Sequence, residues 1–412
     1  MSYQRVGTPK IYIDNINWLL SLGKMSTTDI TSSGASMLSG SSIHEFFDMK
    51  PSNLQTIDCG GASVGFKLKI DTTIGTDATQ DSNFIAILGH NLKSAGAKIS
   101  VQIDDDTNFA SPQGNGDIIS MTDIVNFDIQ ANVDTLTNIA EDLTTSETEI
   151  TVQSGHGSRF SEGDFIQINN EIMYVDSVNS DVLTVDRAST STSATTHSNN
   201  DSIFFTGYSA PAENGWSLAS FNATSDNKFI RLIIDPDGSA NDSFSADVQI
   251  GAILIGEMHE LPVSPDLNIK KKFIYDGVTK NNSVGGQTYT NATFLKGADW
   301  FLEPFENATS SSVGLHTKSG RTSLDMGFSY IDDTDLYPEE LFGRAEVQTN
   351  NQLVPNLISK THAGMFPLLM QYDKDVATDK DSFLWCRLNN EPSFTQVANR
   401  VWNTSLSFIE EF

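Results

Sequence analysis

Short runs in which apolar and polar residues alternate are the feature that most restricts how this chain can fold. Residues 64–70 and 97–103 carry apolar side chains at every second position, with Gly, Lys, Ser or Gln between them. Successive side chains of a strand point to opposite faces, so this pattern predicts antiparallel strands with one buried face. Residues 84–88 and 229–234 form apolar runs, which are typical of strands covered on both faces. The sequence therefore predicts an all-β protein.

Residues 144–201 have the pattern of a separate unit. Short strand patterns follow one another here, with turn residues at 162–164, 169–170 and 179–181. Such regularly interrupted strands predict a small β-barrel. Ser, Thr and Asn dominate both flanks, at 144–148 and 189–202, which indicates linkers at the neck of an insertion. Long loop insertions add little closure entropy, so a sandwich can accommodate such a unit.

The segments on either side of this insertion, 55–143 and 202–262, are predicted to be two halves of one discontinuous β-sandwich. Residues 1–54 carry a short helical pattern at 15–22 and a Ser/Thr/Gly tract, which predict an N-terminal arm that orders against a partner. Residues 263–412 are expected to form a C-terminal β domain, either a second β-sandwich or a tube-like domain. This domain has aromatic-rich strand patterns around Phe301 and at its end, and a short helix at 338–342.

The net charge of −28, from 53 acidic and 25 basic residues, restricts the partners of the chain. A surface that grips duplex DNA needs clustered Lys and Arg, and an anionic membrane likewise repels an acidic protein. We therefore expect no specific nucleic-acid binding and no membrane binding. Several reasons for the charge remain open. It could serve solubility and self-repulsion between monomers, or adaptation to salt, or it could keep DNA from sticking to a surface along which the DNA passes.

The two cysteines, Cys59 and Cys386, lie too far apart in the sequence for a zinc motif or a disulfide framework. Cys386 is in phase with Leu384 and Leu388, so we expect a buried thiol. The first ten residues contain no apolar signal-peptide region, and the longest apolar stretches are too short to cross a bilayer. We expect a protein made in the cytoplasm.

One sequence motif could carry catalysis. Residues 61–65, Gly-Ala-Ser-Val-Gly, match the G-x-S-x-G pattern of a hydrolase nucleophile at Ser63, but that chemistry requires a strand, a sharp turn and then a helix. Here the motif leads directly into a strand pattern, so a glycine-rich turn is the preferred interpretation. The seven histidines show no metalloprotease spacing, and His90 is expected to be a hydrogen-bonded residue at a strand end. We predict that the chain is not an enzyme and has no catalytic residues.

Two acidic clusters offer oxygen ligands of the kind that calcium prefers. One comprises Asp104, Asp105 and Asp106 with Asn108, and the other Asp235, Asp237 and Asp242. Neither has the spacing of an EF-hand loop, so solvated turns are the preferred interpretation. We predict no metal site and no cofactor.

Several segments resemble parts of known virus proteins. Residues 82–92, Ser-Asn-Phe-Ile-Ala-Ile-Leu-Gly-His-Asn-Leu, resemble a strand-and-turn segment of the galactose-binding-like jelly-roll domains in phage tail proteins, and 227–234 with 248–256 resemble the closing strands of that fold. Tyr275-Asp276-Gly277 and residues 285–289 resemble the connector that follows it. The insertion resembles a small barrel that recurs in phage virion proteins. The resemblance rests on residues 165–168, 171–173 and 183–187, followed by Thr195, Thr196 and His197.

The resemblance to distal tail and baseplate-type proteins implies a virion structural protein. It implies a jelly-roll sandwich, and a homo-oligomeric ring, commonly hexameric, that joins the tail tube to the tip and contacts other tail proteins. The jelly roll comes first here, and the barrel is an addition, which departs from the usual order. A carbohydrate-binding module that recognises host surface glycans is the alternative, with Trp216, Trp300 and Tyr208 as candidate sugar-contacting aromatics.

Overall fold

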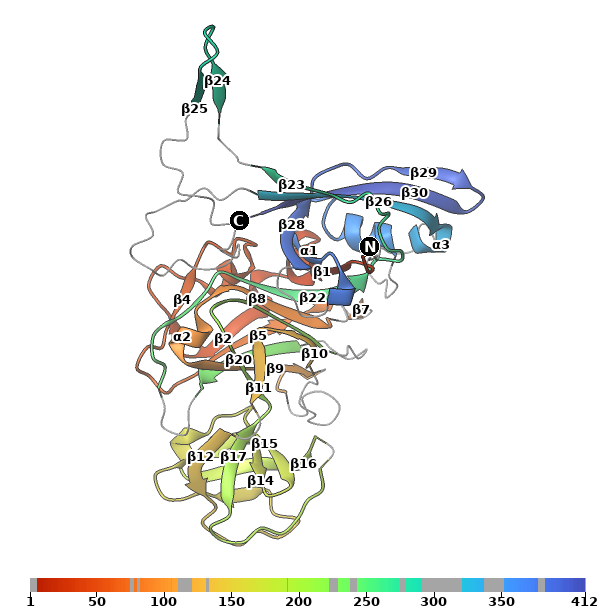
Figure 1. The fold of residues 1–412 in the computed structure, drawn as a ribbon. Helices are drawn as coiled ribbons and strands as arrows, with labels where there is room; N and C mark the ends of the chain where they lie inside the picture. Colours follow the sequence, from red (N-terminus) through yellow and green to blue (C-terminus); the bar gives the residue numbers. More distant parts are fainter. Residues whose placement is uncertain are drawn as a thin grey trace. The chain divides into compact units, whose positions relative to one another are not determined.

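The all-β prediction is confirmed by the computed structural model (Figure 1), in which antiparallel sheets dominate. The structure describes residues 6–74, 78–79, 82–104, 106–109, 121–130, 133–190, 192–221, 229–237, 243–274, 279–290, 321–336, 352–376 and 382–411. The chain divides into two compact units. Unit 1 comprises 1–18, 49–52 and 256–412, and unit 2 comprises 19–48 and 53–255. Among the described residues no helix is both long enough and apolar enough to cross a membrane.

Unit 2 contains a β-sandwich. Its six-stranded sheet is antiparallel throughout, in the order β11 (Phe127–Gln130), β18 (Tyr208–Pro211), β9 (Ala97–Asp104), β20 (Phe229–Pro236), β5 (Phe66–Asp71) and β2 (Ile30–Gly34). The other layer contains β10 (Met121–Val125), β19 (Gly215–Phe221), β8 (Phe84–His90) and the first residues of β22 (Ala252–Glu260). Strands from both predicted halves pair with each other, since β20 lies between β9 and β5.

Smaller elements complete the sandwich. They are β3 (Ser36–Met37), β4 (Gln55–Asp58), β21 (Val248–Ile250), the ribbon β6 (Thr73–Ile74) with β7 (Ala78–Thr79), α2 (Leu92–Ala95) and the short 3₁₀ turns η1 (Thr27–Asp29) and η2 (Ile43–Phe47). The apolar run at β8 is buried along its whole length, as predicted. In β5 buried and half-buried residues alternate, which also agrees with the sequence pattern.

The prediction of one polar, solvated face is wrong for β9. Lys98, Ser100 and Gln102 are only 4%, 4% and 2% exposed. The amide of Gln102 donates to the carbonyl of Gly163 in the insertion, and the Lys98 ammonium lies 4.2 Å from the ring centroid of Phe205. Side chains of the insertion therefore cover this face of the strand.

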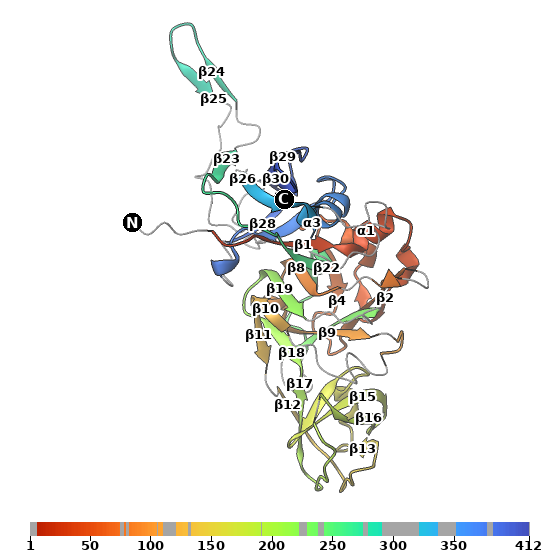
Figure 2. The ribbon, with the colours of Figure 1, turned by 90° about the vertical axis from the view of Figure 1, so that its right-hand side faces the viewer.

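The insertion (Figure 2) is a curled six-stranded sheet in the order β12 (Val133–Asn138), β17 (Ser202–Thr206), β14 (Phe165–Ile168), β15 (Glu171–Asn179), β16 (Val182–Ser189) and β13 (Glu149–Thr151), with the turn η3 (Gly157–Arg159). Its end strands meet only through an isolated bridge between Ile139 and Val152, so the predicted barrel does not close. The two-residue turns after β14 and β15 lie where predicted. Strands β12 and β17 lie outside 144–201, so the sheet extends beyond the predicted boundaries.

Unit 1 is built on one antiparallel sheet. The sheet begins with the second half of β22 and continues with β1 (Lys10–Asp14), β27 (Leu368–Gln371), β28 (Phe383–Leu388), β30 (Val401–Glu410), β26 (Arg321–Asp332) and β23 (Lys270–Ile274). Strand β29 (Phe394–Ala398) also pairs with β30. A separate hairpin consists of β24 (Lys280–Asn282) and β25 (Thr288–Thr290). The helical elements are α1 (Asn15–Ser21), α3 (Asp333–Leu336), the π-helix η4 (Leu353–Ser359) and η5 (Lys374–Val376).

The N-terminal residues take part in this sheet. Strand β1 pairs with residues 256–260 on one side and 369–371 on the other, so these residues order within their own chain. The predicted short helix is present as α1, and Cys386 is fully buried, as expected. The predicted helix at 338–342 and the patterns around Phe301 lie outside the described residues.

Candidate functional site

The structure does not give Ser63 the surroundings of a nucleophile. Ser63 is exposed in a loop that leads into β5, and no helix follows it. A Cβ on Gly65 would lie 1.7 Å from Oδ1 of Asp235, so close packing against β20 explains this glycine. The motif is therefore a tight loop entering a strand.

The other candidate residues do not converge either. Within the described ranges no group of three His, Cys, Asp or Glu residues could hold a metal ion. In the first acidic cluster Asp104 accepts from the backbone of Asp106, which in turn accepts from the backbone of Asn108, as in ordinary turns. Asp105 and Asp242 lie outside the described residues. His90 ends β8, where its Nε2 lies 2.8 Å from Ser217 Oγ, as expected of a hydrogen-bonded residue.

The two candidate sugar-contacting aromatics within the described residues are not exposed platforms. Trp216 and Tyr208 are 3% and 2% exposed, and Trp300 lies outside the described residues. The hydroxyl of Tyr208 donates to Asp164 at 2.5 Å, which is a buried structural contact. Neither Trp216 nor Tyr208 therefore offers an exposed ring to a sugar.

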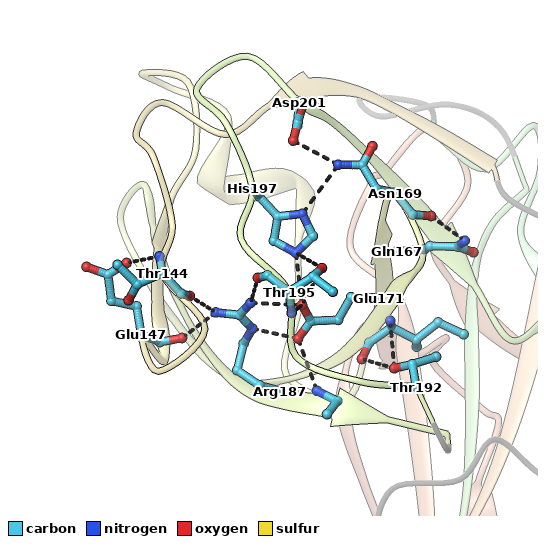
Figure 3. A network of polar contacts seen from close by, with 12 residues as sticks. Thr144, Glu147, Gln167, Asn169, Glu171, Arg187, Thr192, Thr195, His197 and Asp201 are labelled. Carbon is cyan, nitrogen blue, oxygen red and sulfur yellow. Dashed lines mark hydrogen bonds and ion pairs between the residues drawn. The ribbon is translucent and has the colours of Figure 1, made fainter.

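A network of polar contacts lies inside the insertion (Figure 3), and the sequence patterns did not reveal it. Arg187 donates from Nε and Nη2 to the two carboxylate oxygens of Glu171, at 2.7 and 2.8 Å. Glu171 is fully buried, and it also accepts from the backbone of Thr195 and lies 2.9 Å from Nε2 of His197. Burial raises the pKa of Glu171, but hydrogen bonds from Arg187, Thr195 and His197 outweigh burial and lower this pKa to about 2.

This cluster fastens the two Ser/Thr-rich flanks of the insertion. The Arg187 guanidinium also donates to the carbonyls of Thr144 and Glu147 in the first flank and to that of Thr195 in the second. Both oxygens of Glu171 are occupied by donors, so the carboxylate has no free lone pair directed at a substrate. We interpret the cluster as a structural clasp, which corrects the prediction that these flanks are simple linkers.

Unit 1 has a second buried ionic cluster. Lys360, which follows η4, donates to Glu257 on β22, and Nε2 of His259 lies 3.1 Å from the same carboxylate. All three residues are under 10% exposed, and the Lys360 ammonium lies 5.4 Å from the ring centroid of Trp18. Burial raises the pKa of Glu257, but His259 and Lys360 outweigh it and hold this pKa below its usual value. The contacts tie a helix end to the sheet.

Exposed strand edges are the remaining candidates for function among the described residues. Strand β23 ends the sheet of unit 1, and its Lys270, Lys271 and Lys272 are all exposed. The hairpin of β24 and β25 pairs with no other described strand, and it exposes Val284 and Tyr289. A run of three lysines in so acidic a chain was a visible sequence signal for such a surface.

Comparisons with known proteins add no identification. No protein-family model matches the chain, and no curated protein matches it.

Proposed function

We propose that the chain is a non-enzymatic structural subunit of a phage tail that assembles with copies of itself and with other tail proteins into a ring near the tail tip. The observation that carries the proposal is the hairpin of β24 and β25. The hairpin forms a two-stranded sheet of its own, and Val284 and Tyr289 are exposed on it.

An isolated two-stranded hairpin is marginally stable in water. Among the described residues, the hairpin is held by its strand pairing and by bonds such as that from Thr288 Oγ1 to Asn282 Oδ1. A partner that covers Val284 and Tyr289 would stabilise the hairpin by removing apolar surface from water. Hairpin arms that dock on a neighbouring subunit suit an assembly protein.

The lysine edge of β23 supports the same proposal. A second copy of a chain with net charge −28 offers many acidic side chains, which Lys270 and Lys271 would attract, whereas Lys272 already donates to Asp325 of its own chain at 2.7 Å. A contact between two different surfaces of identical subunits closes into a ring when the rotation permits. Lysines on an edge strand also prevent unspecific strand pairing, so their presence alone does not indicate a partner. The hairpin is therefore the stronger argument.

Light scattering of the purified chain during size-exclusion chromatography tests the proposal. We expect oligomers for the wild type and monomers for the double variant Val284→Asp and Tyr289→Ser, because a buried charge disfavours docking. Val64→Asp is the matched control, since Val64 is also an exposed apolar residue, 57% exposed, outside the hairpin. A wild-type chain that stays monomeric at high concentration would contradict the proposal, as would oligomers unchanged by the double variant.

A further inference from the structure

We propose that the outer face of the six-stranded sheet in unit 2 binds a uronate-bearing polysaccharide in a groove beside the insertion. This inference goes beyond the proposed tail role and does not depend on it. The groove has a volume of about 620 Å³. Its floor comes from β2, β5 and β20, and its walls from residues 107–109 and from Glu162 and Asp176 of the insertion.

The strand register places the floor residues on one face. Thr31 of β2 is paired with Lys69 of β5, which is paired with Arg231 of β20. Two residues further along β2, Ser33 is paired with Lys67 of β5. Cross-strand partners project to the same side of a sheet. Since β5 buries Phe66, Leu68 and Ile70 on its other face, the lysines project into the groove.

The shape of the groove follows from side-chain size. On the edge strand β2, Thr31 and Ser33 are short, whereas the neighbouring Lys67 and Lys69 of β5 are long. Short hydroxyl side chains beside long cationic ones leave room above the edge strand. Residues 31–34 of β2 are exposed, so this side of the groove is open to solvent.

The side chain of Arg231 is preorganised for binding an anion. Its Nε and Nη2 donate to Oε1 of Gln102 at 2.8 and 2.5 Å, and Nη2 also donates to the Tyr174 hydroxyl at 2.7 Å. Its guanidinium carbon lies 4.3 Å from the ring centroid of Phe109. These contacts fix the plane of a guanidinium that is 95% buried, so binding a carboxylate would lose little side-chain entropy.

The protein supplies its own carboxylate at this position. Nη1 of Arg231 lies 3.3 Å from Oε1 of Glu162, a long contact to a side chain that is about half exposed. A ligand carboxylate with better geometry would replace Glu162, because charge-assisted bonds to guanidinium are shorter and stronger than this one. Lys69 donates to the carbonyl and the hydroxyl of Thr107 in an exposed contact, and it provides a second cation for the next acidic sugar.

The lining favours an acidic polysaccharide over nucleic acid. Hydroxyls of Thr31 and Ser33 match sugar hydroxyls, whereas single-stranded nucleic acid needs exposed aromatic rings for stacking. Phe109 is 1% exposed, and Arg231 lies over its ring. The net charge of −28 also repels the dense charge of DNA, so short-range contacts to more widely spaced carboxylates fit better.

Calorimetric titration of the full chain with polygalacturonate and with alginate tests the proposal, with neutral dextran, a single-stranded oligonucleotide and oligoglutamate as comparison ligands. We expect binding to a polyuronate and none to dextran. Lys69→Ala should weaken binding by about tenfold, as the loss of one charge-assisted bond predicts. Glu162→Gln should tighten binding, because it removes the competing carboxylate.

Lys93→Ala and Glu149→Gln are the matched controls, because Lys93 and Glu149 are exposed residues of the same unit outside the groove. Both should leave the affinity unchanged. No binding to either polyuronate would overturn the proposal. Equal weakening by Lys93→Ala, or binding of the oligonucleotide or oligoglutamate in place of the polyuronates, would do the same.

Discussion

Arg187 and Glu171 form a two-pronged, buried ion pair at 2.7 and 2.8 Å, and the same guanidinium reaches three backbone carbonyls in both flanks of the insertion. A lysine at position 187 would keep the charge but lose the planar fork. We expect Arg187→Lys to destabilise the full chain by about 2–4 kcal/mol, as when a buried pair is disrupted. Urea unfolding checks this, with the exposed Arg400→Lys as control. Equal stability of the two variants would show that the clasp contributes nothing.

The low pKa of Glu171 gives a pH prediction with a defined sign. Its folded pKa of about 2 lies below the ordinary value of 4.5, so ionised Glu171 stabilises the fold above pH 4.5, and this contribution is lost as the pH falls toward 2. The stability difference between wild type and Glu171→Gln should therefore be largest near neutrality and shrink below pH 4.5. The other carboxyl groups contribute equally to the stability of both proteins, so their contributions cancel in this difference. A difference that is constant from pH 6 to pH 3 would contradict the assignment.

Close packing at Gly65 predicts an intolerant position. A Cβ there would lie 1.7 Å from Oδ1 of Asp235 and 2.8 Å from the carbonyl oxygen of Ile234. Overpacking of this kind costs about 1–3 kcal/mol, so Gly65→Ala should lower the melting temperature. Gly285→Ala is the control, since its nearest neighbour would be Ser283 Oγ at 3.9 Å. Similar melting temperatures for the two variants would be evidence against this packing.

Both thiols should be unreactive in the folded chain. Cys59 and Cys386 are 1% and 0% exposed, and burial raises the pKa of each thiol, so little thiolate is present at neutral pH. We expect an aromatic disulfide reagent to label no thiol in the native protein and two after unfolding. Ser63→Cys should add one rapidly reacting thiol, because Ser63 is exposed. Rapid labelling of native wild-type protein would contradict the described core.

Alternation and turn residues were sufficient to predict much of the fold. Strand β5 and the turns after β14 and β15 follow from side-chain period and from Asn and Asp positions, which act locally. The failures at β9 and β1 have the opposite cause. Gln102 of β9 donates to Gly163, and Tyr12 of β1 pairs with Met258 and Leu369. These neighbours lie far away in the sequence, so a local pattern does not reveal them.

The proposed binding groove and the polar clasp of the insertion were less predictable for the same reason. The lysines of β5 are visible in sequence, but their alignment with Thr31 and Arg231 depends on pairing with β2 and β20. Likewise Glu171, Arg187 and His197 were visible only as separate polar residues. Their convergence needs the turn after β14 and the return of the chain at 195–197.

Quantitative mass spectrometry of purified tailed-phage particles, produced from a genome that includes the coding sequence of this chain, tests the proposed structural role most directly. If the proposal holds, the chain is present in a fixed copy number per particle, in a multiple set by the proposed ring, and it remains after stringent washing. Its absence from the particles, with the chain found only free in the lysate, would contradict the proposal.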